Sequence, residues 1–266
     1  METLKQLLEE EEITQWGVCR LADTLPLIDE TVPLPVHAQS VIVCLFPYDT
    51  GDLPDRNISR YATVPPYPQL LKKILERVCE KLRAQFSEHS FAAFAGNSPI
   101  REVRAAQQAG VGVIGKNGLL INEEYGSFVF IGEIVTDREY PYAVPKGGCS
   151  GCGKCEAACP GKALHDGRVD MTHCLSYLTQ KPEPLTEEEE ELVKKSGIVW
   201  GCDVCSEVCP MNQNRKRSRM KAFCERVIAR AGEPQNDEEL RDRAFGWRGA
   251  EVLRRNLKLV EGDKND

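Results

Sequence analysis

Eight of the twelve cysteines stand at short, regular spacings between residues 149 and 209, and they are the residues most able to do chemistry. The first group, in CSGCGKCEAACP, consists of Cys149, Cys152, Cys155 and Cys159. The second, in CDVCSEVCP, consists of Cys202, Cys205 and Cys209, with Cys174 alone upstream of it. The other four cysteines are scattered singly, which is typical of small buried apolar residues.

The first group follows C-x2-C-x2-C-x3-C-P, the bacterial ferredoxin spacing for four-iron, four-sulfur clusters. In this arrangement three thiolates bind one cube, and the fourth binds the other cube of a two-cluster protein. We therefore expect two clusters with crossed ligands. The first set is Cys149, Cys152, Cys155 and Cys209, and the second is Cys159, Cys174, Cys202 and Cys205.

The alternative for these cysteines is a pair of four-cysteine zinc sites. Zinc sites pair their ligands as C-x2-C knuckles. They have no use for a third cysteine two residues further on, or for the proline that follows the last cysteine of each group. Clusters are therefore favoured, and two adjacent clusters form a short path for electrons.

Charge and apolar patterning indicate where such a protein works. The chain has 34 basic and 41 acidic residues, a net charge of −7, which argues against a general nucleic-acid coat. Its beginning, METLKQLLEEEEITQW, is acidic and unlike a secretory signal, and no apolar run is long enough for a membrane span. We expect a cytoplasmic protein, with reduced thiols and no disulfide framework.

Around the cysteines, apolar periodicity predicts the elements that must position them. Helices are expected over residues 3–15, 67–86, 99–109 and 186–195, and in the stretch 245–260. Strands are expected over 40–48, 89–96 and 126–137. Thr186 and Glu189 form a capping box at the start of the fourth helix. Mixed strands and helices predict an α+β chain divided into residues 1–145, 146–214 and 215–266.

Several segments together resemble the epoxyqueuosine reductase family. They are SRYATVPPYPQLLKKIL, SPIREVRAAQQAGVGVIGKNGLLI, GSFVFIGEI, CSGCGKCEAACPGKAL, CLSYLTQKPEPL and WGCDVCSEVCPMN, in the family's order over most of residues 40–215. The resemblance implies an N-terminal α/β domain that binds cobalamin, followed by a double-cluster ferredoxin-like module and a short helical tail. It implies an oxidoreductase of tRNA queuosine biosynthesis that removes an epoxide oxygen, with a flavodoxin or ferredoxin as electron donor.

The resemblance also assigns residues to the cofactor and to catalysis. The expected corrinoid contacts are Tyr61, Gly96, Lys116, Asn117, Leu120, Ser127 and Ile131. The expected catalytic residues are Tyr67 and Asn97. Each has a plainer reading as a turn glycine, an exposed polar residue or a core residue. The glycine-dense AGVGVIGKNG is interpreted as backbone that approaches a flat ligand closely.

This chain departs from the family pattern at three places. The family's proton-donating aspartate, three residues before the proline of AGNSPIREV, is Gly96 here. The family's Asp-Tyr-His triplet reads Pro66-Tyr67-Pro68, in which only Tyr67 is kept. The 266 residues leave no room for the helical-repeat extension that grips tRNA, although NRKRSRMK (214–221) offers a small basic stretch.

These departures leave alternatives open for the function. The chain is a reductase of the epoxyqueuosine reductase type, a paralogue that acts on another substrate, a corrinoid-reducing or reactivating protein, or a plain ferredoxin-type electron carrier. A tRNA partner is one possibility, and the sequence carries no signal for the oligomeric state.

Overall fold

The computed structural model describes residues 1–165 and 167–262. By its internal packing the chain divides into two compact units, each assembled from separate stretches of sequence. Unit 1 consists of Met1–Pro47, Tyr67–Gly115 and Leu119–Cys149. Unit 2 consists of Tyr48–Pro66, Lys116–Gly118 and Ser150–Asp266.

This division differs from the linear one drawn from the sequence. Two segments of the N-terminal half, 48–66 and 116–118, pack with the cysteine-rich region, and residues 215–266 belong to the same unit. The C-terminal helix α9 (Ala250–Glu261) packs against α6 (Glu187–Ser196). Composition and linker signals could not reveal this division, because it depends on contacts between residues far apart in the chain.

Unit 1 is built on an antiparallel sheet with the strand order β1-β2-β6-β3. Its strands are β1 (Gln15–Arg20), β2 (Ser40–Pro47), β3 (Phe91–Ala95) and β6 (Val129–Thr136). A separate short ribbon pairs β4 (Val113–Ile114) with β5 (Leu120–Ile121). The α+β fold class is confirmed, because every strand pair is antiparallel.

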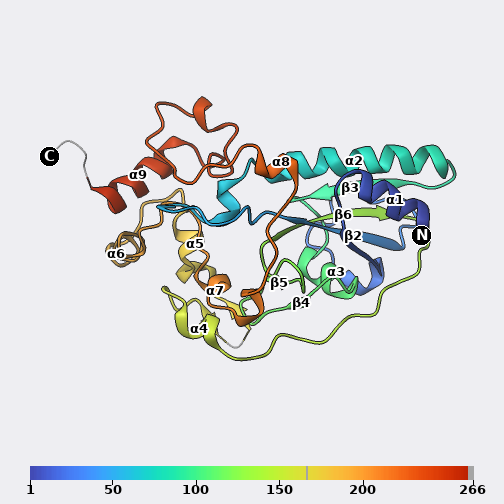
Figure 1. The fold of residues 1–266 in the computed structure, drawn as a ribbon, viewed down its shortest axis with the longest axis horizontal. Helices are drawn as coiled ribbons and strands as arrows, with labels where there is room; N and C mark the ends of the chain where they lie inside the picture. The colour runs from blue at the N-terminus through green and yellow to red at the C-terminus, as the bar shows by residue number, and fades with distance from the viewer. Residues whose placement is uncertain (166, 263–266) are drawn as a thin grey trace. The chain divides into compact units, whose positions relative to one another are not determined.

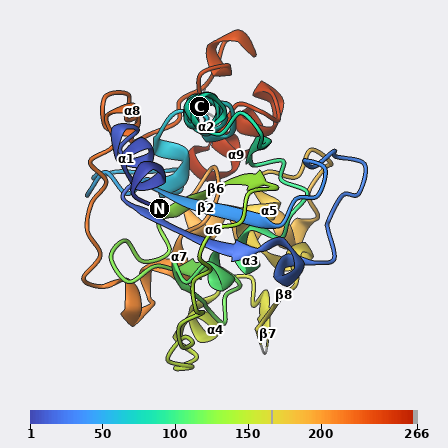
Figure 2. The same ribbon diagram turned by 90° about the vertical axis from the view of Figure 1, so that its right-hand side faces the viewer.

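Helices cover both faces of this sheet. Figures 1 and 2 both place α1 (Glu2–Glu10) and α2 (Tyr67–Gln85) on one face and α3 (Glu102–Gln108) on the other. Every residue of β2 is buried, as expected for a strand that packs between helices on both sides. Its side chains at Val41, Val43 and Leu45 join the apolar core beneath α3.

The first predicted helix is too long. The sequence pattern carries it to Gln15, but the helix ends at Glu10 and Gln15 begins β1. The reason is local: Glu12 takes a left-handed φ of 62°, which a continuing helix does not allow. The sequence analysis missed β1, because QWGVCR lacks a clear alternation of apolar and polar residues.

Unit 2 is made of short helices and turns. They are η2 (Arg60–Thr63), α4 (Lys154–Ala158), η3 (Met171–His173), α5 (Leu175–Leu178), α6, α7 (Val204–Glu207), η4 (Pro210–Asn212), α8 (Lys221–Cys224), η5 (Glu238–Leu240) and α9. One hairpin joins β7 (Leu164–His165) to β8 (Arg168–Val169). The predicted capping box is confirmed, since the Thr186 hydroxyl accepts a hydrogen bond from the Glu189 backbone N–H and the Glu189 carboxylate accepts one from the Thr186 backbone N–H.

Candidate iron–sulfur centre and the acidic residues of the first unit

Short helices position most of the eight cysteines. Cys155 lies in α4, Cys205 lies in α7, and Cys174 caps α5. Helices α4 and α7 pack against each other, and this contact brings the two cysteine groups together within unit 2. Cys149 is the last residue of unit 1, and the other seven predicted ligands belong to unit 2.

The electrostatic neighbours of the thiols follow the crossed ligand sets. The pKa of Cys155 is affected by Cys209, a pair within the first predicted set. The pKa of Cys205 is affected by Cys174 and Cys159, and that of Cys202 by Cys205 and Cys174. Each of these couplings lies within one predicted set. The thiols therefore fit two clusters with the ligands exchanged between the motifs.

Two thiols of the second set, those of Cys202 and Cys205, are partly shielded from water. Burial raises the pKa of Cys202 to about 12 and also raises that of Cys205. Thiols in such surroundings ionise when a metal binds them. The side chain of Asn117 hydrogen-bonds Cys205, and the backbone N–H of Ala163 donates to Cys159 Sγ at 3.2 Å. Hydrogen bonds of this kind tune the reduction potential of a cluster.

Among the described residues, no three His, Cys, Asp or Glu side chains converge closely enough to hold a single metal ion. A four-iron cube does not require its thiolates to converge on one point, because each thiolate binds a separate iron atom at its own corner.

A buried ion-pair network ties the segment 48–66 to the second cysteine group. Asp203, between Cys202 and Cys205, accepts hydrogen bonds from Arg56 Nη1 at 2.5 Å and from the Arg60 backbone N–H at 2.8 Å. The guanidinium of Arg60 also bonds Asp49 at 3.0 Å. The loop that carries these cysteines is therefore anchored on both sides by charge-assisted hydrogen bonds.

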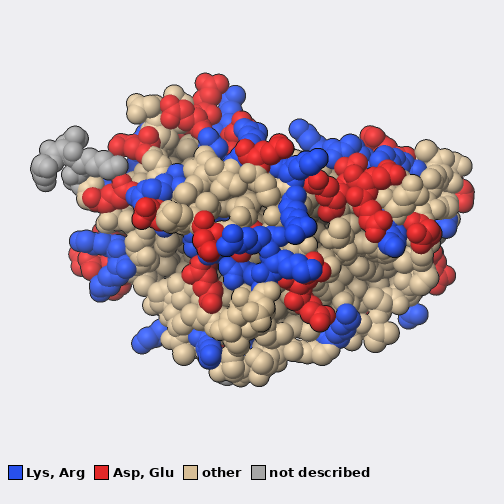
Figure 3. Space-filling model, viewed as in Figure 1, with Lys and Arg blue, Asp and Glu red and all other residues tan. Residues whose placement is uncertain are grey.

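This network neutralises part of the basic stretch 214–221. Arg215 pairs with Asp49 at 2.6 Å, and Arg217 pairs with Asp52 at 2.8 Å. Figure 3 shows Lys and Arg side chains gathered over the chain between α7 and α8, with acidic side chains among them. Two arginines of the stretch are already paired with carboxylates, so fewer of its positive charges are available to bind phosphate.

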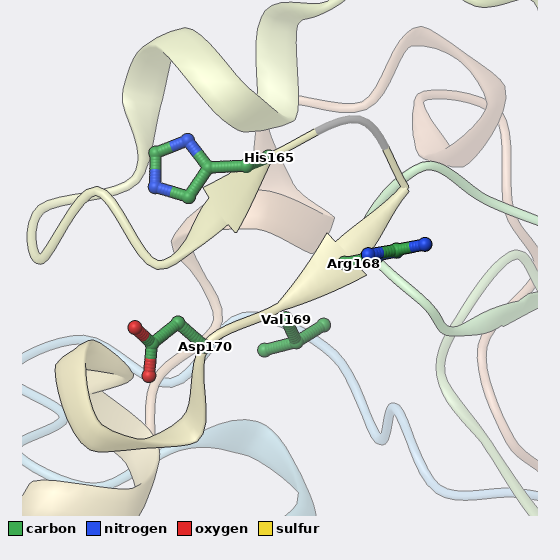
Figure 4. A pocket seen from close by; sticks show the side chains of 4 residues that line it. All are labelled: His165, Arg168, Val169 and Asp170. Atoms are coloured by element: carbon green, nitrogen blue, oxygen red, sulfur yellow. The ribbon is translucent and has the colours of Figure 1, made fainter.

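A cavity of about 540 Å³ lies at the β7–β8 hairpin, lined by His165, Arg168, Val169 and Asp170. Figure 4 shows His165 and Asp170 on one side of the hairpin, with the Arg168 side chain extending to the other. Asp170 also accepts from Thr172 at 2.6 Å, so its carboxylate stabilises the turn that leads to Cys174. None of the expected corrinoid contacts lines this cavity.

The residues assigned to the corrinoid by resemblance fall into both units. Tyr61, Lys116 and Asn117 belong to unit 2, where Lys116 pairs with Glu156 at 2.9 Å. Gly96, Leu120, Ser127 and Ile131 belong to unit 1, where Leu120 and Ile131 are packed in the apolar core beneath α3. Most of these side chains therefore already have a partner within their own unit.

The glycine-dense stretch also has a packing explanation. A side chain at Gly112 would place its Cβ 2.8 Å from the Ile121 carbonyl oxygen and 2.9 Å from Leu120 Cδ1. Glycine is thus required for β4 and β5 to pair closely. A ligand is not needed to account for it.

The predicted catalytic residues lie in unit 1. Tyr67 is the first residue of α2, and its ring stacks on Phe130 with centroids 3.9 Å apart and planes 9° from parallel. Asn97 is exposed in the turn after β3. The sequence analysis missed Glu102 and Glu133, two carboxyl groups whose pKa values burial raises. Only the acidic residue type within otherwise apolar segments could have drawn attention to them.

The cysteine-rich region matches a known protein family. Residues 148–212 match the family described as the 4Fe-4S double cluster binding domain. The fold and the thiol sets thus define a double-cluster iron–sulfur protein.

The chain is a homologue of the epoxyqueuosine reductases. It is 31% identical to the epoxyqueuosine reductase of Lactococcus garvieae over 211 residues, which cover 75% of this chain and 60% of that protein. It therefore spans about three fifths of the length of that relative.

Solved structures share the fold. The structure of epoxyqueuosine reductase from Streptococcus thermophilus superposes with a TM-score of 0.84 at 22% identity, covering 97% of this chain and 79% of that one. An epoxyqueuosine reductase with an epoxyqueuosine-modified tRNA stem loop superposes with a TM-score of 0.80 at 22% identity, covering 97% and 80%. In the described part of the chain no helix is long and apolar enough to cross a membrane.

Proposed function

We propose that the chain is an iron–sulfur-dependent reductase that removes the epoxide oxygen of epoxyqueuosine in tRNA. The observation that carries the proposal is the packing of α4 against α7, which brings Cys155 within electrostatic reach of Cys209 and Cys205 within reach of Cys159. Homology to the epoxyqueuosine reductases extends beyond this cluster region to three quarters of the chain.

Electrons would enter from a small low-potential carrier, a flavodoxin or a ferredoxin, and cross the two clusters. The hydrogen bond from Asn117 to Cys205 would raise the potential of the second cluster, because hydrogen bonds to sulfur stabilise the reduced state.

Cobalamin belongs to the proposal because the family resemblance implies it. When bound, a corrinoid supplies a strongly reducing cobalt centre next to the substrate. The residues assigned to it do not form a ready site within either unit, since Leu120 and Ile131 are core residues and Lys116 is paired with Glu156.

A second candidate is a protein that reduces a corrinoid for a partner enzyme. It is favoured by one observation, the absence of a carboxyl group at Gly96, where the resemblance places the family's acid. A plain electron carrier is the third reading, and it requires neither a substrate nor a corrinoid.

One experiment separates these readings. The chain is reconstituted with iron and sulfide without oxygen and given a low-potential reductant, cob(II)alamin and an epoxyqueuosine-containing tRNA stem loop. We expect the nucleoside to lose one oxygen atom by mass spectrometry, in a reaction that requires the clusters.

The other outcomes each select a different protein. Cobalamin reduction without loss of oxygen from the nucleoside indicates the corrinoid-reducing protein. Cluster reduction with an unchanged cobalamin spectrum indicates the electron carrier. Either result contradicts the proposed reductase. A tRNA stem loop that carries queuosine itself is the matched control, because it has no epoxide oxygen to lose.

A further inference from the structure

The backbone at Gly96 is built for glycine. Its φ of +75° lies in the left-handed region, and a Cβ there would sit 3.0 Å from Pro68 Cβ and 3.1 Å from Pro68 Cγ. Gly96 and Pro68 are two of the positions at which the chain departs from its relatives, and they are in contact. The two departures are therefore in contact, and Pro68 packs tightly against the point from which a side chain at position 96 would extend.

A carboxyl group nevertheless lies beside this position. Glu102, the first residue of α3, accepts a hydrogen bond from the Gly96 backbone N–H through Oε1 at 3.3 Å. Its side chain is neither fully exposed nor fully buried. Burial raises the pKa of Glu102, and the Gly96 N–H opposes this effect. A glutamate in such a place holds a proton more readily than an exposed one.

Tyr67 faces the same group. Burial raises the pKa of its phenol, and the charge of Glu102 raises it further, so the two side chains lie within electrostatic reach. The stack on Phe130 fixes the orientation of the ring. The phenol of Tyr67 therefore lies near Glu102 and holds its proton more firmly than an exposed tyrosine does.

Glu133 completes the cluster from β6, where it lies opposite Val43 and Phe94. Its side chain is 0% exposed, and within the described residues neither carboxylate oxygen makes a well-formed hydrogen bond. Burial raises the pKa of Glu133 well above its usual range, the charge of Glu102 raises it further, and Ser98 offsets part of the effect. Glu133 therefore holds its proton more firmly than an exposed glutamate does.

We propose that Glu102 donates the proton to the leaving oxygen, in place of the carboxyl group that position 96 lacks, with the phenol of Tyr67 close by. This inference rests on the proposed function. Removing an epoxide oxygen takes two electrons and two protons: both C–O bonds break, a C=C bond forms, and the oxygen leaves as water. The electrons come from the external donor through the clusters. Glu102 gives one proton and regains it from solvent at its exposed side, and water supplies the other proton.

Substituting Glu102 tests the assignment in the reconstituted, full-length protein with the tRNA stem loop. Glu102→Gln keeps the size and the hydrogen bond to Gly96 but has no acidic proton. We expect its turnover to fall on the order of 100-fold or more, with iron content and cluster reduction unchanged. Glu102→Asp should keep part of the activity. Glu139→Gln, which changes an exposed glutamate in the same unit, should match the unsubstituted protein.

Chemical rescue separates proton donation from a structural role. In Glu102→Ala, added formate should restore turnover in proportion to its concentration, which a purely structural defect would not allow. Full activity in Glu102→Gln would overturn the proposal. So would a Tyr67→Phe variant that loses turnover while Glu102→Gln keeps it.

If the unsubstituted chain does not act on the stem loop at all, the proposed function fails, and the acid assignment is tested without substrate. Infrared difference spectra of unsubstituted protein and Glu102→Gln then report the protonation of this carboxyl group. Retention of its proton above the usual pH range of glutamate supports the assignment. Ionisation within that range contradicts it.

Discussion

Replacing Cys174 with alanine should remove one of the two clusters and leave the other. Cys174 is the single cysteine outside the two motifs that the predicted ligand sets require, and its thiol affects the pKa of both Cys202 and Cys205. Without it the second cube has three protein ligands. We expect iron to fall from about eight to about four atoms per chain after anaerobic reconstitution, with the loss of one cluster signal in paramagnetic resonance.

Cys224→Ala is the matched control for this substitution. Cys224 is exposed, lies outside both motifs, and makes only a long contact of 3.5 Å with the Ser218 carbonyl oxygen among the hydrogen bonds described for its thiol. Its replacement should leave the iron content unchanged. A Cys174→Ala protein that keeps both cubes would show that the crossed ligand sets are wrong, although the motifs themselves would stand.

The second large effect is expected on stability when Asp203 is replaced. This carboxylate, with 8% of its side chain exposed, binds the guanidinium of Arg56 and the backbone of Arg60. Asp203→Ala would leave Arg56, which is 13% exposed, without its closest partner in a poorly solvated site. Breaking a buried pair in this way costs about 3–5 kcal/mol. We expect a loss of that size in the free energy of unfolding, measured by urea denaturation without oxygen.

Asp52→Ala provides the comparison within the same network. The Asp52 side chain is 81% exposed and pairs with Arg217 at 2.8 Å. An exposed ion pair contributes about 0–1 kcal/mol, so this substitution should shift the unfolding midpoint only slightly. Equal losses in the two variants would mean that the Asp203 network does not anchor the cysteine loop.

Local signals allowed much of the fold to be predicted. The ferredoxin spacing predicts seven of the eight proposed ligands, because those thiols lie within two short motifs. The capping box at Thr186 was predictable for the same reason, since N-cap and partner are three residues apart. Strand β2 was recognisable as a continuous apolar run.

Features that depend on distant contacts could not be predicted. The ion pair between Arg56 and Asp203 joins residues 147 positions apart. The hydrogen bond of Asn117 to Cys205 likewise joins residues far apart in the sequence, whereas the resemblance assigned Asn117 to the corrinoid. Glu133 stands in a buried strand where the pattern alone gives no reason for an acid, and only its packing shows that the carboxyl group is dry.

Position 96 shows the limit of a residue-by-residue comparison. From the sequence, Gly96 and Pro68 are two separate losses, and the proton donor has no replacement. In the fold they are one contact, with Glu102 bound to the same backbone N–H that position 96 presents. The chemistry of this region therefore has to be judged from the group of side chains around Gly96.

The most direct test is the metal content of the unsubstituted protein, purified and reconstituted without oxygen. Eight thiolates that hold two cubes predict about eight irons and about eight acid-labile sulfides per chain. Zinc in place of iron, without labile sulfide, would contradict the cluster assignment and remove the basis of the electron path.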